Sequence, residues 1–239
     1  MRSNEPSLSP RLAMVAGLLP AGRRLIDIGT DHAYLPIIAV KRGLYEQAVA
    51  ADIRHGPLAV AERNIRRFAC ADHLTAVLSN GLSAFDCRPG DVVVIAGLGG
   101  LEMIDILEAA PDRWPHLVLQ PQKSDPILRA YLAESGYSIC SEALCSDDRR
   151  LYVAMVAERA AERSAEYAAE QSADNVRISP IDQYIGPCLR RERPPFFTEW
   201  LSRQRVQVQH AIRRGESLTA LLHEIDRLLT EARADEKTR

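Results

Sequence analysis

The chain has 239 residues, enough for one large domain or for one domain with a small accessory part. Hydrophobic residues make up 46% of it and aromatic residues only 5%, which indicates a globular protein with a mainly aliphatic core. The formal net charge of −2 argues against a general nucleic-acid binder, because such proteins usually carry a basic excess. No apolar run approaches the length of a membrane span, and the N-terminus lacks the apolar stretch of a signal peptide. We therefore expect a cytoplasmic protein that makes no membrane contact.

The five cysteines are odd in number and irregularly spaced, and no C-x-x-C pair occurs among them. This pattern favours free, mostly buried thiols in a reducing compartment over a disulfide framework. It also argues against a zinc site, so we expect no bound metal.

Strand-like and helix-like segments alternate over the first 158 residues. After a short apolar helix, five buried strands are separated by helical segments, as in βαβ units with a parallel sheet. Two further strands have no helix between them and read as a hairpin, so one of them must be antiparallel to the rest. The expected fold is therefore α/β and doubly wound, with a seven-stranded, mostly parallel sheet. The expected strands are 24–28, 47–52, 74–78, 91–96, 116–120, 137–144 and 150–157, and the expected helices are 11–19, 36–42, 57–69, 100–109 and 125–135.

The composition changes at residue 159, which predicts one domain over 1–158 and a helical C-terminal domain over 159–239. Residues 159–177 are rich in alanine and glutamate and suit a solvated helix or a linker. From 196 to 234 the pattern is helical throughout, with leucines and an isoleucine at three- and four-residue spacing. This stripe predicts a helical hairpin or a short coiled coil.

The loop after the first strand carries Asp27, Gly29, Asp31 and His32. In a doubly wound sheet, ligands bind at the carboxyl ends of the strands near the point where the strand order reverses. Gly29 lets the backbone approach a ligand closely. The single glycine and the two carboxylates differ from a dinucleotide-binding loop and suit a cationic ligand such as S-adenosylmethionine. The alternative is a plain turn after a strand.

Two further signals follow the second and third strands. Asp52 lies some twenty residues after the glycine loop, where an acidic side chain can accept hydrogen bonds from both hydroxyls of a ribose. Asn80 and Gly81 are placed to meet an adenine edge. Alone, Asp52 could also be a helix cap or a surface acid, and Asn-Gly is also an ordinary turn sequence.

The central strand ends in Ala96-Gly97-Leu98-Gly99, whose glycines leave room for a flat substrate beside a methyl donor. A tight strand-to-helix turn would give the same pattern. Gln120 and Pro121, after the next strand, are expected to border the same crevice.

The motifs DIGTDHAYLP (27–36), ADIRHGPL (51–58), NGL (80–82), IAGLGG (95–100) and LQPQ (119–122) together resemble the TrmK family. Members of this family are bacterial tRNA (adenine-N1) methyltransferases that act on the adenosine at tRNA position 22. The resemblance runs in order through residues 11–158, and IGPCL (185–189) resembles an element before the family's helical domain. It implies a class I, Rossmann-like methyltransferase domain, a coiled-coil C-terminal domain, S-adenosylmethionine as cofactor and tRNA as substrate.

By this resemblance, Asp27, Gly29, Asp31 and His32 border the methionine part of the cofactor, Asp52 holds its ribose, and Asn80-Gly81 its adenine. Ala96 and Gly97 are also expected to bind the cofactor. Asp31 and the loop Gly97-Leu98-Gly99 are the expected catalytic elements, and Tyr34 is an expected substrate contact. The family usually has glutamate at position 52 and aspartate at position 80, so the two departures bear on cofactor affinity.

Seven arginines and two glutamates lie between Arg190 and Arg214, with three large aromatic residues among them. Arginine forks onto phosphates and aromatic rings stack on bases, so the segment is a candidate tRNA contact. The alternative is a solvated helix face with its aromatic rings buried at the domain junction. The arginines expected to bind tRNA are Arg190, Arg191, Arg193 and Arg203.

Two other functions remain compatible with the sequence. A class I methyltransferase could act on a protein or a small molecule, with the C-terminal helices serving dimerisation. A methyltransferase-fold protein could also bind RNA without turnover. We expect a monomeric tRNA methyltransferase in which Asp31 stabilises the cationic product or contacts the 6-amino group of adenine.

Overall fold

The computed structural model describes residues 5–159 and 178–238. Its strands are β1 (Arg24–Ile28), β2 (Gln47–Asp52), β3 (Leu74–Leu78), β4 (Asp91–Ala96), β5 (His116–Gln120), β6 (Tyr137–Asp147) and β7 (Arg150–Arg159). Its helices are α1 (Pro10–Gly17), α2 (Tyr34–Lys41), α3 (His55–Arg67), α4 (Gly100–Glu108), α5 (Asp125–Glu134), α7 (Pro180–Ile185), α8 (Pro187–Glu192), α9 (Phe197–Arg213) and α10 (Thr219–Thr238).

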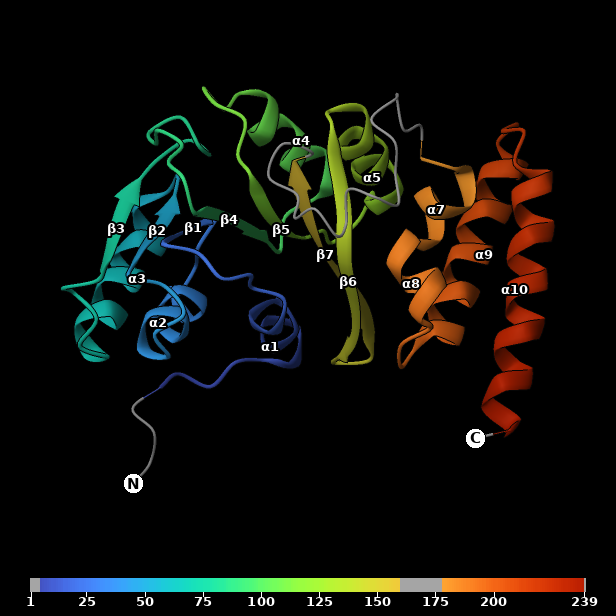
Figure 1. Ribbon diagram of the computed structural model, residues 1–239, viewed down its shortest axis with the longest axis horizontal. Helices are drawn as coiled ribbons and strands as arrows, with labels where there is room; N and C mark the ends of the chain where they lie inside the picture. The colour runs from blue at the N-terminus through green and yellow to red at the C-terminus, as the bar shows by residue number, and fades with distance from the viewer. Residues whose placement is uncertain (1–4, 160–177, 239) are drawn as a thin grey trace.

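The seven strands form one sheet in the order β3-β2-β1-β4-β5-β7-β6. All neighbouring strands from β3 to β5 are parallel, whereas β7 is antiparallel to both β5 and β6. The predicted α/β class, the strand count and the terminal hairpin are thereby confirmed. In Figure 1, α1, α2 and α3 lie on one side of the sheet and α4 and α5 on the other.

Two apolar cores explain this layering. One joins side chains of α1, α2 and α3, such as Ile37 and Ala61, to one face of the sheet. The other joins α4 and α5, through residues such as Met103 and Leu128, to the opposite face. β4 lies between both cores, and its residues Val92 to Ile95 are completely buried. A continuous β-branched run is what a central strand covered on both faces requires.

The chain passes from β1 outward to β2 and β3 and then returns to β4, which pairs with the other edge of β1. The strand order therefore reverses between β1 and β4. The loops that leave these two strands diverge to opposite faces of the sheet and open a crevice at the carboxyl ends.

The C-terminal helices form a hairpin of α9 and α10 that packs on α7 (Figure 1). The helical pattern predicted over 196–234 is interrupted between Arg213 and Thr219, where Gly215 adopts φ +98° and ends the α9 segment. The two short helices α7 and α8 occupy a region where the sequence showed only breaks. The segment 159–177, predicted to be a solvated helix or a linker, lies outside the described residues from residue 160 onward. The domain boundary at 158/159 stays a prediction.

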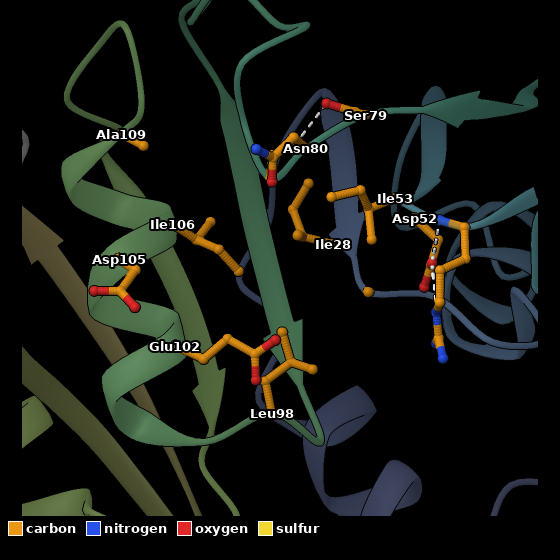
Figure 2. Close-up of a pocket in the computed structure, with 13 residues that line it drawn as sticks. Ile28, Asp52, Ile53, Ser79, Asn80, Leu98, Glu102, Asp105, Ile106 and Ala109 are labelled. Carbon is orange, nitrogen blue, oxygen red and sulfur yellow. Dashed lines mark hydrogen bonds and ion pairs between the residues drawn. The ribbon is translucent and has the colours of Figure 1, made fainter.

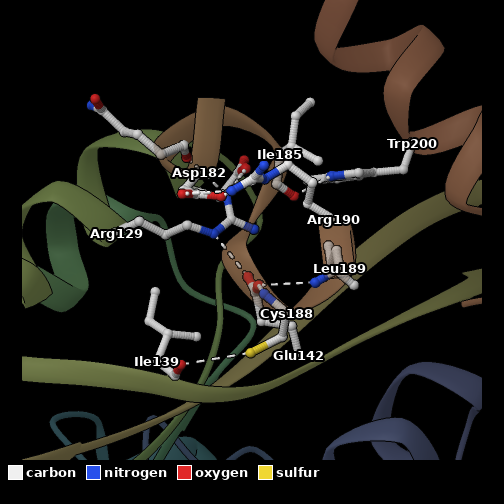
Figure 3. Close-up of polar contacts among 11 residues, drawn as sticks. Arg129, Ile139, Glu142, Asp182, Ile185, Cys188, Leu189, Arg190 and Trp200 are labelled. Atoms are coloured by element: carbon white, nitrogen blue, oxygen red, sulfur yellow. Dashed lines mark hydrogen bonds and ion pairs between the residues drawn. The ribbon is translucent and has the colours of Figure 1, made fainter. Parts of the chain in front are cut away.

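A buried ionic cluster attaches the C-terminal helices to the sheet domain (Figure 3). Arg129 of α5 contacts Asp125 at 3.1 Å and Glu142 of β6 at 2.9 Å. Glu142 also accepts hydrogen bonds from the backbone N–H groups of Cys188 at 3.0 Å and Leu189 at 3.4 Å, at the start of α8. The motif IGPCL therefore forms part of the contact between the two parts of the chain, beside the hydrogen bond from Arg203 to the carbonyl of Leu151.

Within the described ranges 5–159 and 178–238, no helix combines the length and apolar character needed to cross a bilayer.

Candidate active site

Two cavities open at the carboxyl ends of the strands, and Gly29 lines both. The larger cavity has a volume of about 610 Å³ and lies between the ends of β1, β2 and β3 and the helix α4 (Figure 2). The smaller cavity, of about 150 Å³, lies between α1, the loop after β1 and the end of β4. The loop residues predicted from the sequence are therefore brought together in one two-part site.

Asp52 supplies a buried carboxylate to the larger cavity, with only 4% of the residue exposed. Its Oδ1 atom accepts hydrogen bonds from the backbone N–H of Arg54 at 2.8 Å and from Nε of Arg54 at 3.2 Å. Among the described residues, Oδ2 receives no hydrogen bond, so one acceptor oxygen remains for a ligand hydroxyl. The role of Arg54 was not predicted, and its pKa is raised by this contact with Asp52.

Isoleucine side chains wall the larger cavity on facing sides. Ile53 follows β2 and is 61% exposed, while Ile106 comes from α4 (Figure 2). Gly81 adopts φ +58°, and a Cβ atom there would lie 3.0 Å from Cγ2 of Ile106. Asn80, which precedes it, lines the same cavity. The apolar walls and the polar amide make a slot suited to a flat heterocycle. The sequence did carry a signal for this apolar wall, namely the isoleucine at position 53 directly after Asp52.

Asp27 lines the smaller cavity and is only 7% exposed. Burial raises the pKa of this carboxyl from 3.8 to about 7, and a hydrogen bond with Thr30 opposes the shift. A buried carboxylate with a raised pKa gains stability from a cation brought beside it. Asp27 therefore favours a positively charged group on its side of the smaller cavity, whose lining also includes the cationic side chain of Arg11.

The loop after β1 is held in place by hydrogen bonds of side chains that were not among the predicted site residues. Oγ1 of Thr30 accepts a hydrogen bond from the backbone N–H of Ala33 at 3.2 Å, and Nδ2 of Asn64 donates to the carbonyl of His32 at 2.9 Å. Ala33 adopts the left-handed conformation with φ 56°. Asn64 lies on α3 and had no sequence signal as a support of this loop.

Asp31 and His32 project from this loop toward solvent. The Asp31 side chain is 72% exposed, and its Oδ2 atom lies 3.3 Å from Nε2 of His32. The His32 ring stacks on Tyr34 with a centroid distance of 5.1 Å. All three residues line the smaller cavity, so the predicted catalytic and substrate-contacting side chains share its mouth.

The glycine loop after β4 separates the two cavities. Gly97 has φ +87°, and its N–H donates to the carbonyl of Gln120 at 3.0 Å. Leu98 lines the larger cavity and would contact a Cβ atom on Gly29 at 3.4 Å, while Ala96 lines the smaller one. Gly99 is the N-cap of α4. Of the predicted loop residues, Leu98 lines the larger cavity, whereas Gly97 and Gly99 line neither of the two, and the catalytic role of the loop stays a prediction.

The structure corrects the prediction for Gln120 and Pro121, because both are buried and neither lines either of the two cavities of this site. Gln120 is 0% exposed, and both ends of its amide are engaged: Oε1 accepts a hydrogen bond from Nη1 of Arg11 at 2.7 Å, and Nε2 donates to the carbonyl of Pro121 at 2.9 Å. The side chain that reaches the cavity is Arg11, which the sequence analysis missed.

The four C-terminal arginines predicted to bind tRNA have partners within the protein. Arg190 pairs with Asp182, Arg191 with Glu192, Arg193 with Glu231 and Asp235, and Arg203 donates to the carbonyl of Leu151. Among the aromatic residues, Phe197 and Trp200 are buried and Phe196 is 42% exposed. The structure therefore favours the alternative of a solvated helix face with two of its three large aromatic rings buried at the junction.

A family model described as a methyltransferase domain matches residues 8–155. The Bacillus subtilis tRNA (adenine(22)-N(1))-methyltransferase is 33% identical over 210 residues, which cover 87% of this chain and 84% of the relative. This chain belongs to the TrmK family.

Solved TrmK-type structures share the whole architecture. A candidate tRNA (m1A22) methyltransferase of Streptococcus pneumoniae, solved with S-adenosyl-L-methionine, is 29% identical with a TM-score of 0.78, over 93% of this chain and 100% of that one. Bacillus subtilis TrmK is 27% identical with a TM-score of 0.72, over 97% and 96%. The similarity extends through the C-terminal helices.

Proposed function

We propose that the protein transfers the methyl group of S-adenosylmethionine to N1 of an adenosine in tRNA, at position 22 as in the relatives of that name. The observation that carries the proposal is the two-part site at the β1/β4 switch point, with Asp52 in a nucleoside-sized cavity and Asp27, which favours a cation beside it, in a small cavity. The TrmK relatives named for this reaction support the assignment.

The residues present fit the cofactor. Asp52 would accept from the ribose hydroxyls through its free oxygen, and Ile53 and Ile106 would enclose the adenine. Asp27 would lie near the positively charged methionine part. Asparagine at position 80 keeps an acceptor for the adenine amino group, so the departure from the usual family residue is compatible with binding. The cofactor supplies an electrophilic methyl group when bound, and the remaining chemistry falls to positioning.

Adenine N1 attacks through its own lone pair, so the protein needs no strong general base. It must hold N1 in line with the methyl group, and most of the rate enhancement comes from this orientation. A paired adenine must first leave its helix to present its Watson–Crick edge. The stacked rings of His32 and Tyr34 at the mouth of the smaller cavity offer a surface for the displaced base.

Methylation at N1 leaves a positive charge on the adenine. Asp31, exposed beside the smaller cavity, is the carboxylate placed to stabilise that charge. A fixed negative charge aimed at a site where positive charge develops lowers the barrier without reorganisation during the reaction.

The test uses the purified full chain, labelled S-adenosylmethionine and total bacterial tRNA, followed by digestion to nucleosides. N1-methyladenosine is the expected product, and sequencing of the modified tRNA then maps position 22. Label in protein instead of tRNA would favour the alternative methyltransferase function. Cofactor binding without any transfer would favour a non-catalytic RNA-binding protein.

Four finer points belong to the same proposal. The protein acts in the cytoplasm, as a monomer, and divides into a catalytic domain over 1–158 and a helical domain over 159–239. The C-terminal helices contact tRNA through the exposed ring of Phe196 and the side chains of Arg190 and Arg191, which stay 41% and 56% exposed beside their acidic partners. Size-exclusion chromatography with light scattering tests the monomer.

A further inference from the structure

The peptide group between His32 and Ala33 is fixed from both sides by buried side chains. Nδ2 of Asn64 donates to its carbonyl oxygen at 2.9 Å, and its N–H donates to Oγ1 of Thr30 at 3.2 Å. The carbonyl and the N–H of one trans peptide lie in one plane and point in opposite directions. Thr30 is 4% exposed and Asn64 8%. A rotation of this peptide would therefore break both hydrogen bonds and leave buried polar groups without partners.

The fixed peptide maintains an unfavourable backbone conformation. Ala33 is the N-cap of α2 and has φ 56° and ψ 23°, and its side chain makes no capping hydrogen bond. A residue with a Cβ atom disfavours the left-handed region, and N-cap residues normally have an extended backbone. Such a conformation persists only where the surrounding structure imposes it. The two hydrogen bonds from Thr30 and Asn64 supply this constraint.

The direction of the Asp31 side chain depends on this backbone. The side chain is 72% exposed, and among the described residues its one ion pair is with His32, whose own side chain is 48% exposed. The loop is also fixed where it begins, because the N–H groups of Gly29 and Thr30 both donate to the carbonyl of Ala51, at 2.8 and 3.0 Å. Asp31 and His32 thus lie between two fixed points of the main chain.

Thr30 also connects the loop to the carboxyl of Asp27. A hydroxyl group has one hydrogen to donate and two lone pairs that accept. Thr30 accepts from the N–H of Ala33, and its side chain also hydrogen-bonds Asp27, which opposes the rise in the pKa of that carboxyl. The same side chain therefore contacts both the cation-favouring carboxyl of the smaller cavity and the peptide after His32.

We propose that Asn64 and Thr30 are positioning residues for methyl transfer, which fix the His32–Ala33 peptide and thereby aim the Asp31 carboxylate at the target adenine. Neither residue touches the substrate in this role. Asn64 is suited to it because it lies on α3, a helix anchored by its own core contacts and independent of the loop. The inference rests on the proposed methylation of adenine N1 and on the role given there to Asp31.

The test compares Asn64→Leu, Thr30→Val and Thr30→Ser with the unchanged full chain. Leucine and valine keep the approximate size of the side chain and remove its polar atoms, whereas serine keeps the hydroxyl. Tyr137→Phe is the matched control. The buried hydroxyl of Tyr137 also donates to a carbonyl, that of Trp114 at 2.9 Å, which precedes β5 at the end of the sheet opposite the site.

The rate of N1-methyladenosine formation is measured in single turnover, with saturating S-adenosylmethionine and tRNA. Saturation keeps changes in cofactor affinity out of the rate, which is needed because Thr30 also contacts Asp27. Asn64→Leu and Thr30→Val are also made in the Asp31→Asn protein. The Kd values for S-adenosylhomocysteine and for tRNA are measured separately, and thermal unfolding checks the fold.

We expect Asn64→Leu and Thr30→Val to lower the single-turnover rate about 10- to 100-fold, because a small misplacement of a catalytic group has effects of this size. Thr30→Ser stays close to the unchanged protein, and Asn64→Leu leaves both Kd values unchanged. In the Asp31→Asn protein the two substitutions lower the rate little further, since the group that they position has already lost its charge. Tyr137→Phe lowers the melting temperature as Asn64→Leu does, without changing the rate.

Equal fold losses with and without the Asp31 charge would overturn the proposal, as would a Thr30→Ser protein as slow as Thr30→Val. A similar rate loss in Tyr137→Phe would also overturn it, since lower stability alone would then explain the effect. If Asn64→Leu fails to fold, or if Asp31→Asn has no measurable rate, the comparison of the two Thr30 variants decides. An unchanged protein that makes no N1-methyladenosine refutes the proposed function itself, whereas normal rates in Asn64→Leu and Thr30→Val refute the positioning role alone.

Discussion

The Nε atom of Arg129 lies 2.9 Å from Oε1 of Glu142, and neither side chain is exposed to solvent. The pair joins α5 to β6, and the second oxygen of Glu142 binds the first N–H groups of α8. Gly186 is required at this point, because a Cβ atom there would lie 2.5 Å from the Glu142 oxygens. Burial raises the pKa of Glu142 against the opposing effect of Arg129. The carboxylate is therefore retained in an apolar place only while all its partners are present.

Replacing Glu142 by leucine should lower the free energy of unfolding by roughly 3 kcal/mol, because the change leaves the completely buried Arg129 with Asp125 as its one carboxylate partner among the described residues. Urea unfolding followed by circular dichroism measures the difference. Arg214→Gln is the control: Arg214 and Glu216 form an exposed pair, which should contribute at most about 1 kcal/mol. Equal effects of the two substitutions would contradict the role given to the buried cluster.

Asp31→Ala should reduce the rate of methyl transfer by about 10²- to 10³-fold or abolish it, because the charge facing the developing adenine cation is lost. Single-turnover kinetics with tRNA measures the chemical step. The side chain is 72% exposed, so thermal unfolding should be unaffected. Asp72→Ala removes another exposed aspartate, remote from the site, as the control. Near-normal methylation by Asp31→Ala would refute this role.

Gly81→Ala should weaken cofactor binding by about 10-fold or more, because the new methyl group would press on Ile106 and narrow the adenine slot. Gly43→Ala provides a matched comparison, since Gly43 also has a positive φ, of +67°, but no atom lies within 4 Å of its added Cβ. Both substitutions should lower the free energy of unfolding by about 1 kcal/mol through backbone strain. Calorimetric titration with S-adenosylhomocysteine separates them, and equal affinities would show that the slot is not where the adenine binds.

Asp27→Asn should stabilise the protein without cofactor at high pH and weaken cofactor binding. The folded-state pKa of Asp27 is raised from 3.8 to about 7, so its contribution to stability is fully present below 3.8 and is lost as pH rises through about 7. Asparagine cannot ionise and avoids that loss. The gain in melting temperature should therefore be absent at about pH 4 and largest at about pH 8.

The same substitution tests the binding role of Asp27. The affinity of the unchanged protein for S-adenosylmethionine should rise between about pH 5.5 and 7.5, below the range in which α-amino groups lose their proton. Calorimetry should show a flat and weaker profile for Asp27→Asn. A parallel rise in both proteins would assign the pH dependence to another group.

The parts of this structure that follow from local sequence were predictable. The β-branched run at 91–96 specified the central strand, and Asp27, Asp52 and Asn80 lie where carboxyl ends of parallel strands converge. Contacts between distant segments were not predictable in this way. Nothing near Arg11 indicates that it would meet Gln120, 109 positions away, and nothing in the pattern pairs Glu142 with the start of α8.

The arginine-rich segment is a second case in which contacts between distant segments could not be predicted from the local sequence. A count of charges between Arg190 and Arg214 indicates a basic surface, but it does not include Asp182, Glu231 and Asp235, which the fold places opposite these arginines. Local net charge overestimates the available positive potential wherever partners come from elsewhere in the chain. The prediction that Gln120 borders the crevice was wrong for a related reason. Gln120 lies at the end of β5, and Arg11 of α1, a helix that precedes the sheet in the sequence, covers it.

The β6–β7 hairpin contributes to three apolar cores at once, since its residues Ala154 and Val156 also pack with α1, α2 and α3. Its residues Met155 and Ala157 pack with α4 and α5, while Val153, with Leu144 and Leu151, packs against the C-terminal helices. A protein cut after β7 would expose this apolar strip and deprive Glu142 of its α8 partners. The catalytic domain is therefore no independent module, and a truncated form would be prone to self-association through the hairpin. Loss of activity on truncation would then report a damaged sheet edge as much as a missing tRNA contact, so the helices' part in substrate recognition is best studied by point substitutions.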